Sequence, residues 1–316
     1  MKLLRIENTP HIRDVLTTQR IMLLVIASLL PAAVSSVVHF GWRAALLIVF
    51  CMAFSTACEG LCRILMKREQ TIRDGSAALT GLLLALNLPV TLPLWEAGVG
   101  CFIAIVAVKQ LFGGLGQNFA NPAITARIML MLSVTEDMTH WIRPGEGYDA
   151  VSSATPLSGG EATLADLFWG TNIGGCLGET SAAMLLLGAV FLLALGIISP
   201  AAPFSYIGTM ALCTLIYVLA NGGDMTEIPR QLLSGGLLLG AFFMATDYVT
   251  TPITTTGRMI FGIGCGVLTF LIRTFGSYPE GVSFAILLMN ILTPYIDRFT
   301  VSHPFGAEPQ KGGAAK

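Results

Sequence analysis

The chain has 316 residues, of which 54% are hydrophobic and only 12% are charged. Ordinary soluble domains carry about 25% charged residues, so this composition indicates a protein built for lipid. The formal net charge of −1 and the lack of a basic stretch with interleaved aromatic residues argue against nucleic-acid binding.

The N-terminal segment lacks the pattern of a cleavable signal peptide. Lys2, Arg5, Arg13 and Arg20 are spread out before the first apolar run, and no small-residue cleavage site closes that run. We therefore expect the run to be retained as the first membrane span.

Apolar runs of membrane-spanning character recur along the whole chain. Ten candidate spans are read at 21–38, 44–62, 75–90, 95–111, 122–135, 180–198, 204–221, 231–247, 258–273 and 281–297. Lys and Arg gather before the first span and between the second and third, which makes that side cytoplasmic by the positive-inside rule. Both termini are then cytoplasmic, and the polar loop 136–179 lies on the opposite, extracytoplasmic side.

Two spans are interrupted in the same manner. The segment 81–93 contains Asn87 and two prolines, and the segment 236–252 contains Asp247 and ends in a proline. They are third among the first five spans and third among the second five. Because five is odd, the second half must run inverted relative to the first, and such paired breaks point to a site near the middle of the bilayer.

The predicted fold is therefore an all-α polytopic membrane protein, with about ten transmembrane helices in two inverted five-helix repeats. The expected units are a first repeat at 1–135, an extracytoplasmic loop at 136–179, a second, inverted repeat at 180–298 and a cytoplasmic tail at 299–316.

The long loop carries the most informative string of the chain, Asp149-Ala-Val-Ser152-Ser153-Ala154-Thr155. Small neighbours present the final hydroxyl, and a carboxylate lies upstream. Judged by itself, the string also fits a turn rich in Ser and Thr, whose short side chains bond local backbone.

Three glycines near the end of the loop precede the next predicted helix. Gly174, Gly175 and Gly178 leave backbone N–H groups at a helix start, where a phosphate binds well. Glu179 would oppose an anion there, so an ordinary helix start capped by Thr180 or Ser181 is an equal alternative.

Polar residues inside the spans are candidates for an ion site or a cofactor site, because burying such groups in lipid is costly. Asp247 could hold a cation or bond the edge of a cofactor, or it could be a polar end at the cytoplasmic surface beside Arg258. Asn87 is expected to cap broken backbone. The members of this group are Asn87, Asp247, Thr251, Lys109 and Arg127.

Two basic residues have simpler interpretations as well. Lys109 and Arg127 could meet phosphate or cofactor oxygens, but anchoring on the positive inner side is favoured for Lys109. Glu59 could belong to an ion path, although Arg63 at i+4 offers an ordinary helix pair.

The sequence predicts no metal site. The seven cysteines form no C-x-x-C cluster, and the four histidines form no ligand-spaced pair. A zinc site, a complete iron–sulfur cluster and haem are therefore not expected from this chain.

The assembled motifs resemble the RnfD family of membrane proteins, which belong to the Rnf ion-translocating oxidoreductase complex. They are similar, more distantly, to the NqrB protein of the sodium-pumping NADH:quinone oxidoreductase. The resemblance covers nearly the whole chain. The segments that carry it are 152–155, 80–93, 109–122, 174–181 and 244–252.

This resemblance implies covalent FMN on Thr155, attached by a flavin transferase, with Asp149, Ser152, Ser153 and Ala154 as parts of the acceptor. It implies a urea-channel-like fold and no catalytic residue of its own. The implied role is to pass electrons in a chain between NADH and ferredoxin or another low-potential acceptor, coupled to movement of Na+ or H+. Riboflavin, as a second and non-covalent flavin, follows by analogy with the quinone reductase.

The implied partners are the other Rnf subunits, among them a flavoprotein and iron–sulfur subunits, together with membrane lipid. No strand–turn–helix unit with a G-x-G-x-x-G motif is found, so NADH is expected to react elsewhere in the complex. A small-solute channel and a redox-inactive scaffold remain the alternatives.

Overall fold

The computed structural model describes residues 17–145, 155, 157, 162–171, 173–276 and 280–300, and every regular element within them is helical. The acceptor residues Asp149, Ser152, Ser153 and Ala154 lie outside the described residues. Thr155 lies within them.

The helices follow one another with short connections, apart from the loop after α6. In the first half they are α1 (Thr18–Phe40), α2 (Trp42–Leu65), η1 (Ile72–Asp74), α3 (Ser76–Leu86), α4 (Leu94–Phe102), η2 (Ile103–Gln110) and α5 (Pro122–Ser133). In the loop region they are α6 (Thr135–Met138), α7 (Leu164–Trp169) and η4 (Leu177–Glu179). In the second half they are α8 (Ala182–Ala194), α9 (Ala201–Asn221), α10 (Glu227–Leu233), α11 (Leu237–Leu239), η5 (Gly240–Met244), α12 (Thr255–Phe275) and α13 (Val282–Thr300).

Five of the described helices, α1, α2, α9, α12 and α13, are long and apolar enough to cross a membrane. The helices α3, α5 and α8 are apolar but shorter, and α4 continues directly into the π-helix η2. The chain is therefore an all-helical, polytopic membrane protein. The count of ten spans and the inverted relation of the two halves stay predictions.

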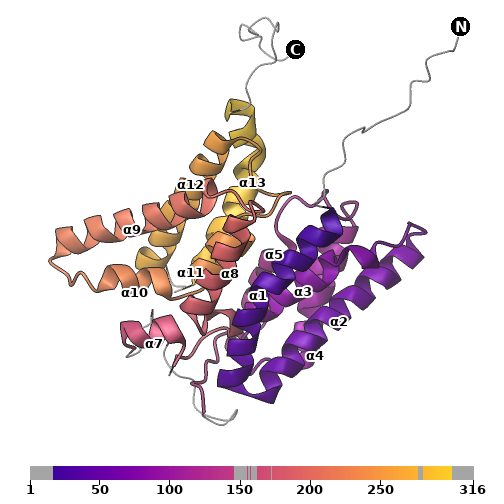
Figure 1. Cartoon of the computed structure of the whole chain (residues 1–316), viewed down its shortest axis with the longest axis horizontal. Helices are drawn as coiled ribbons and strands as arrows, with labels where there is room; N and C mark the ends of the chain where they lie inside the picture. The colour runs from indigo at the N-terminus through magenta and orange to yellow at the C-terminus, as the bar shows by residue number, and fades with distance from the viewer. Residues whose placement is uncertain are drawn as a thin grey trace, which may run out of the picture.

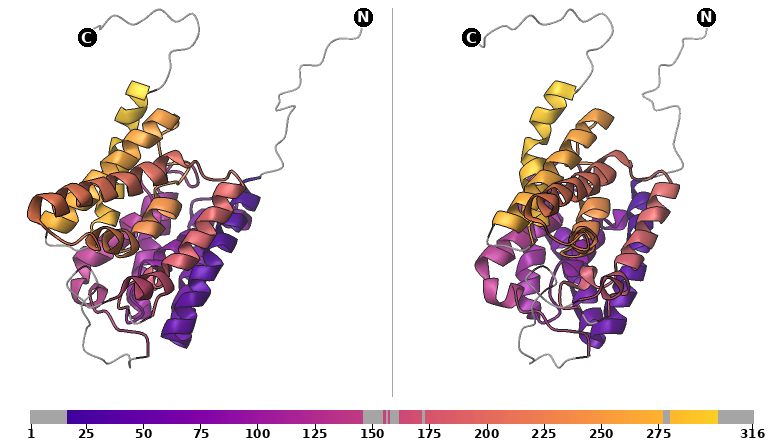
Figure 2. Two further views of the ribbon diagram at one scale, coloured as in Figure 1. Left: turned by 60° about the vertical axis from the view of Figure 1, so that its left-hand side comes forward. Right: turned by 90° about the vertical axis from the view of Figure 1, so that its left-hand side faces the viewer.

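The two halves form separate groups of helices joined across a common middle. Figure 1 shows α2, α3 and α4 on one side and α9, α10, α12 and α13 on the other. The crossing contacts are made by α8, which packs along α1, and by α13, which packs on α5. Figure 2 shows α8 running beside the indigo helix α1.

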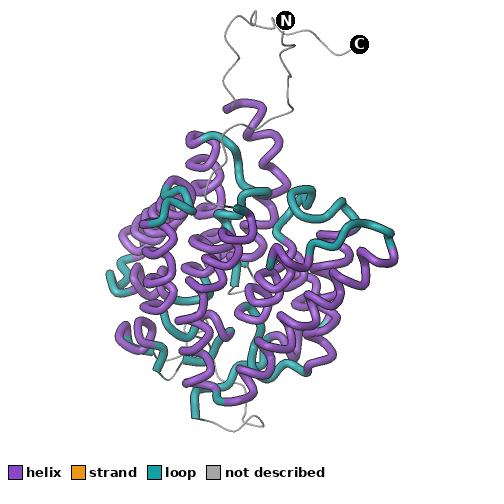
Figure 3. Tube along the Cα trace, turned by 45° about the vertical axis from the view of Figure 1, so that its right-hand side comes forward, coloured by secondary structure: helices purple, strands orange, loops and turns teal. Residues whose placement is uncertain are grey.

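Both predicted interruptions are present. α3 ends at Leu86, and the chain is non-helical until α4; η5 ends at Met244, and the chain is non-helical until α12. Figure 3 shows such loop segments, in teal, between the helices as well as at the ends of the molecule.

The ends of the two interrupted helices meet at the start of α5. The Asn87 amide nitrogen lies 3.6 Å from the Met244 sulfur, and the Asn121 amide donates to the Met244 carbonyl at 3.4 Å. Asn121 also caps α5, whose first residue is Pro122, a combination that starts a helix firmly. The Asn121 side chain thus bonds a backbone carbonyl at the end of an interrupted helix. Such bonds are needed because lipid offers no hydrogen-bond partner to the backbone.

Both ends of the loop helix α7 are fixed by local capping residues. Thr163 and Asp166 form a reciprocal capping box, and Gly170 ends the helix with left-handed backbone. The hydrogen bonds from Thr163 and Thr171 hold the pKa of the exposed Asp166 carboxyl below its ordinary value. These bonds fix the part of the loop that follows Thr155.

Candidate functional site

Thr155 is buried, with 4% of its surface exposed, and it lines a small pocket. The pocket has a volume of about 10 Å³, which is room for about one water molecule. Its walls are Leu157, Leu167, Ile173, Glu179, Ser234, Gly235 and Glu280. Thr155 therefore borders a pocket formed by apolar side chains, a serine, a glycine and two carboxylates.

Arg127 organises the groups behind this pocket. It is 2% exposed, and its guanidinium forms ion pairs with Glu280 and, at 3.8 Å, with Glu179. It also donates to the Asn87 side-chain oxygen at 2.9 Å and to the Ser283 hydroxyl at 3.1 Å. Two predicted residues, Asn87 and Arg127, thus lie together beside the Thr155 pocket.

Cys176, Glu179 and Glu280 offer ligand atoms that all lie within 4.8 Å of one another. The Arg127 guanidinium nitrogen lies 3.2 Å from the Cys176 sulfur and pairs with both carboxylates. Because a guanidinium already serves as the cation of this cluster, its geometry fits a buried ion-pair network better than a metal centre.

The glycines at the end of the loop are tightly packed. A Cβ added at Gly175 would lie 2.9 Å from the Glu179 carboxylate, and one added at Gly178 would lie 2.8 Å from the Leu86 carbonyl. Gly174 is buried as well. Ser181 is the cap of α8, accepting from the Met184 N–H at 3.4 Å, as one of the two sequence interpretations predicted.

A second cavity, of about 100 Å³, lies on the other side of the helix ends. Lys109 of η2 and Asp247, three residues after η5, both line it. Asn121 lines it too, six residues before Arg127, which corresponds to about 9 Å along α5. The other polar lining groups include Ser76, Thr80, Asn118 and Thr246.

Asp247 shows features of both environments that were predicted for it, a cation or cofactor site and a polar end beside Arg258. It lines the second cavity and also a smaller one beside Arg258. Its carboxylate accepts from the Val249 N–H at 3.4 Å and from the Thr250 hydroxyl at 3.3 Å. Thr251 bonds the Ala245 carbonyl at 3.0 Å, so it satisfies the helix break.

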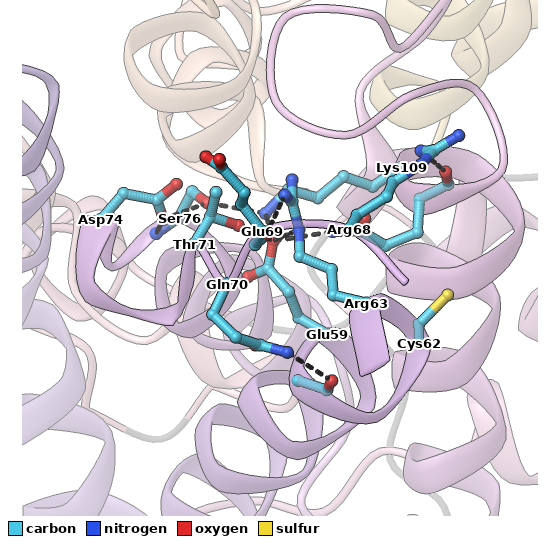
Figure 4. A network of polar contacts seen from close by, with 12 residues as sticks. Glu59, Cys62, Arg63, Arg68, Glu69, Gln70, Thr71, Asp74, Ser76 and Lys109 are labelled. Carbon is cyan, nitrogen blue, oxygen red and sulfur yellow. Dashed lines mark hydrogen bonds and ion pairs between the residues drawn. The ribbon is translucent and has the colours of Figure 1, made fainter. Parts of the chain in front are cut away.

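The favoured interpretation of Lys109 as a surface anchor was wrong. Its side chain is 2% exposed, and its ammonium donates to the Ser76 hydroxyl at 2.7 Å and lies 3.2 Å from the Glu59 carboxylate. The partner expected for Glu59, Arg63, is farther away at 3.9 Å. Figure 4 shows this network around Glu59.

Sequence reasoning did not single out Arg273 or Gln110. The Arg273 guanidinium donates to the carbonyls of Ser234 and Gly235, which are walls of the Thr155 pocket. The sequence did carry one signal for Arg273. An arginine at the outer end of a span is an exception to the positive-inside rule. Gln110 is fully buried and donates to the Glu59 carboxylate at 2.7 Å.

Comparison with known proteins identifies the family of this chain. Residues 5–306 match the model of the NQR2, RnfD, RnfE family. The chain belongs to that family. It is 44% identical to the D subunit of the Na+-translocating ferredoxin:NAD+ oxidoreductase complex of Acetobacterium woodii, covering 96% of this chain and 95% of the relative.

Two further relatives are similar over comparable lengths. The D subunit of the proton-translocating ferredoxin:NAD+ oxidoreductase complex of Clostridium ljungdahlii is 41% identical, over 95% of this chain and 96% of the relative. The D subunit of the ion-translocating oxidoreductase complex of Escherichia fergusonii is 35% identical, over 96% and 98%. The family members thus include proteins named for each of the two ions.

Proposed function

We propose that this chain is an electron-carrying membrane subunit of an ion-translocating ferredoxin:NAD+ oxidoreductase complex, with FMN bound covalently to Thr155. The observation that carries the proposal is the Asp149–Thr155 acceptor string in a chain whose relatives are named as subunits of such complexes. The flavoprotein and iron–sulfur subunits of the complex are its proposed partners. A flavin transferase would attach the FMN to Thr155.

The pocket beside Thr155 contains two carboxylates and is too small for either the phosphate or the ring of an attached FMN. A pocket of about 10 Å³ leaves no room for an isoalloxazine, so the ring would lie outside it. Arg273 donates to the carbonyls of two pocket residues and so brings a positive charge to the wall of a pocket that also contains Glu179 and Glu280. Since Thr155 is buried, the transferase must act before the loop closes or during a local opening.

When bound, the flavin supplies the one- and two-electron chemistry, while the protein supplies position and electrostatics. The Arg127 network would fix the wall behind the flavin attachment, since its guanidinium joins α5 to Asn87 and to Glu280. Rigid walls keep the distances to neighbouring carriers constant.

The second cavity suits an ion better than a second flavin. Its volume of about 100 Å³ is below the 300–1,000 Å³ usual for organic ligands. A carboxylate at a helix break inside a membrane is a natural cation ligand. In this proposal Asp247 therefore binds Na+ or H+ during coupled electron transfer, and riboflavin in the cavity is the alternative.

The flavin attachment is tested by in-gel fluorescence of the denatured protein from cells that contain the transferase. The wild type should give a fluorescent band, and Thr155→Ala should abolish it because no ester oxygen is left. Thr171→Ala, which removes another loop hydroxyl bonded to Asp166, is the matched control and should keep the band. A fluorescent Thr155→Ala band would move the flavin elsewhere, and a dark wild-type band would favour a channel or scaffold.

The ion proposal is tested by Asp247→Asn in the intact complex. Because the amide keeps the size but not the charge, ion uptake per electron in proteoliposomes should fall at least about tenfold while assembly is retained. Unchanged coupled uptake would reduce Asp247 to a structural polar group at the helix break.

A further inference from the structure

A groove on the surface of α1 faces the membrane and is bordered by α7 and α8. Along α1 it runs from Ala27 to His39, and Trp169 of α7 and Met184 of α8 close its other side. Its volume of about 570 Å³ exceeds that of the two cavities described above. The volume falls in the range of roughly 300–1,000 Å³ that is usual for sites of organic ligands.

Two polar side chains lie at one end of this groove. Ser35 and His39 are one turn apart on the same face of α1, and both are half-buried. Among the described residues, neither side chain has a hydrogen-bond partner. Ser28 and Ser36 of the same helix, in contrast, donate to carbonyls of the preceding turn. Because hydrocarbon offers no partner to a hydroxyl or an imidazole, these two groups favour a ligand that brings oxygen atoms to this end.

The rest of the α1 lining is apolar. Leu30, Val34 and Val38 follow one another at successive turns, and each is more than half exposed. Pro31 and Ala27 continue the surface toward the middle of the helix. The groove is therefore amphipathic along its length, with oxygen-binding groups at one end and hydrocarbon along the remainder.

The length of the groove matches one leaflet of a bilayer. From Ala27 to His39 the helix rises by about 18 Å, at about 1.5 Å per residue. Half of the hydrocarbon core of a bilayer is about 15 Å thick. The polar end lies near the end of α1 and beside Trp169, a residue type that is enriched at the membrane–water interface. The apolar end lies near the middle of α1, where an acyl chain would end.

We propose that this groove binds a phospholipid, with one acyl chain along α1 and with head-group oxygens that accept hydrogen bonds from Ser35 and His39. The lipid belongs to the leaflet on the side of the 136–179 loop. A helix of a partner subunit would cover the apolar length equally well, but the oxygen acceptors of a phospholipid are confined to one end, as the groove requires. The inference is independent of the flavin.

The proposed lipid joins a membrane helix to the loop that contains Thr155. Gly170, which ends α7, packs against both of its neighbours at this point. A Cβ added there would lie 3.3 Å from the His39 imidazole and 1.9 Å from the Thr180 carbonyl. A phospholipid between α1 and Trp169 would fill the space beside this contact and hold α7 against α1.

The experiment uses the intact complex in vesicles of phosphatidylethanolamine that contain an increasing fraction of a phospholipid with a diazirine on one acyl chain. After irradiation, the chain is isolated on a denaturing gel and digested, and the label on each peptide is measured by mass spectrometry. In the wild type, the label on the α1 peptide should saturate as the probe fraction rises, because a single site becomes filled.

Two variants change the groove in different ways. Val34→Trp fills it and should abolish the saturable label. Ser35→Ala combined with His39→Phe removes two hydrogen bonds, so the probe fraction for half-saturation should rise about tenfold. Leu23→Trp is the matched control, because Leu23 is 52% exposed on the same helix, against 59% for Val34, but does not line the groove. It should label as the wild type does.

A label that rises in proportion to the probe fraction, or that Val34→Trp leaves unchanged, would overturn the proposal by showing ordinary contact with bulk lipid. A wild-type α1 peptide without label would overturn it as well, since another subunit would then cover the groove. Unchanged half-saturation in the Ser35→Ala, His39→Phe variant would remove the two residues from the site. If Val34→Trp does not assemble, Val34→Phe replaces it, with the same predicted direction.

Discussion

At the scale of single residues, the most important feature is the buried side chain of Arg127. The guanidinium joins two carboxylates, an amide and a hydroxyl from three separate parts of the chain. In a low-dielectric interior each partner depends on the other, so removing one leaves a charge that nothing nearby neutralises.

Arg127→Gln should therefore destabilise the protein by about 3–5 kcal/mol, because Glu179 and Glu280 would remain buried without their cation. Adding Glu280→Gln should recover part of this loss. Thermal unfolding in detergent of the two single variants and the double variant measures the coupling. A double variant as unstable as the sum of the single changes would show that the pair is not coupled.

Residue types indicated where charges would be found but not how deeply they would lie. Asn87, Arg127, Lys109 and Asp247 were all recognised as unusual in a membrane span. Lys109 was assigned to the surface because a lysine near the end of a span is usually an anchor. The π-helix η2 explains the difference, since its wider turn brings the adjacent Lys109 and Gln110 to the same carboxylate.

At the scale of elements, helices approach closely wherever a glycine faces a neighbouring backbone. A Cβ added at Gly188 of α8 would lie 2.1 Å from the Ser28 carbonyl of α1. This contact joins the two halves of the chain, and it uses the small-residue packing usual in membrane helices.

Gly188→Ala should separate α1 from α8 and destabilise the protein by about 1–3 kcal/mol, despite the better helix propensity of Ala. Gly208→Ala in α9 is the matched control, because an added Cβ there meets nothing within 4 Å. It should be neutral or slightly stabilising. Equal thermal unfolding midpoints for the two variants would contradict the proposed packing.

Hydropathy predicted the long helices well, whereas their ends required tertiary information. The predicted span 231–247 is divided by Gly235 and Gly236, which both have left-handed backbone. The start of α5 at Pro122 agreed with the prediction because its signal is local. The end of α3 at Leu86 depends instead on the distant groups that satisfy the break.

At the scale of the whole molecule, two polar sites lie on either side of the meeting point of the interrupted helices. The Thr155 pocket and the Arg127 network lie on one side, and the Lys109–Asp247 cavity lies on the other. α5 connects them, because Asn121 lines the cavity and Arg127 belongs to the network. In the proposed function, coupling between electron and ion movement would pass along this helix.

The sequence could predict the membrane class and some of the residues that form these sites, but not Glu280, Arg273 or Gln110, and not how the residues are grouped. Asn87 was expected to cap broken backbone, and its amide does donate to the Leu83 carbonyl at 2.7 Å; that its oxygen also accepts from Arg127 was not predicted. Glu280 lies far from Arg127 along the chain, so only the folded arrangement reveals their ion pair.

The central claim concerns the Thr155 oxygen, and mass spectrometry of the peptide that contains it, prepared from native membranes, tests it most directly. The account predicts that this peptide carries the mass of FMN less one water, with fragment ions that place the modification on Thr155. An unmodified peptide from membranes active in ferredoxin:NAD+ oxidoreduction would contradict it.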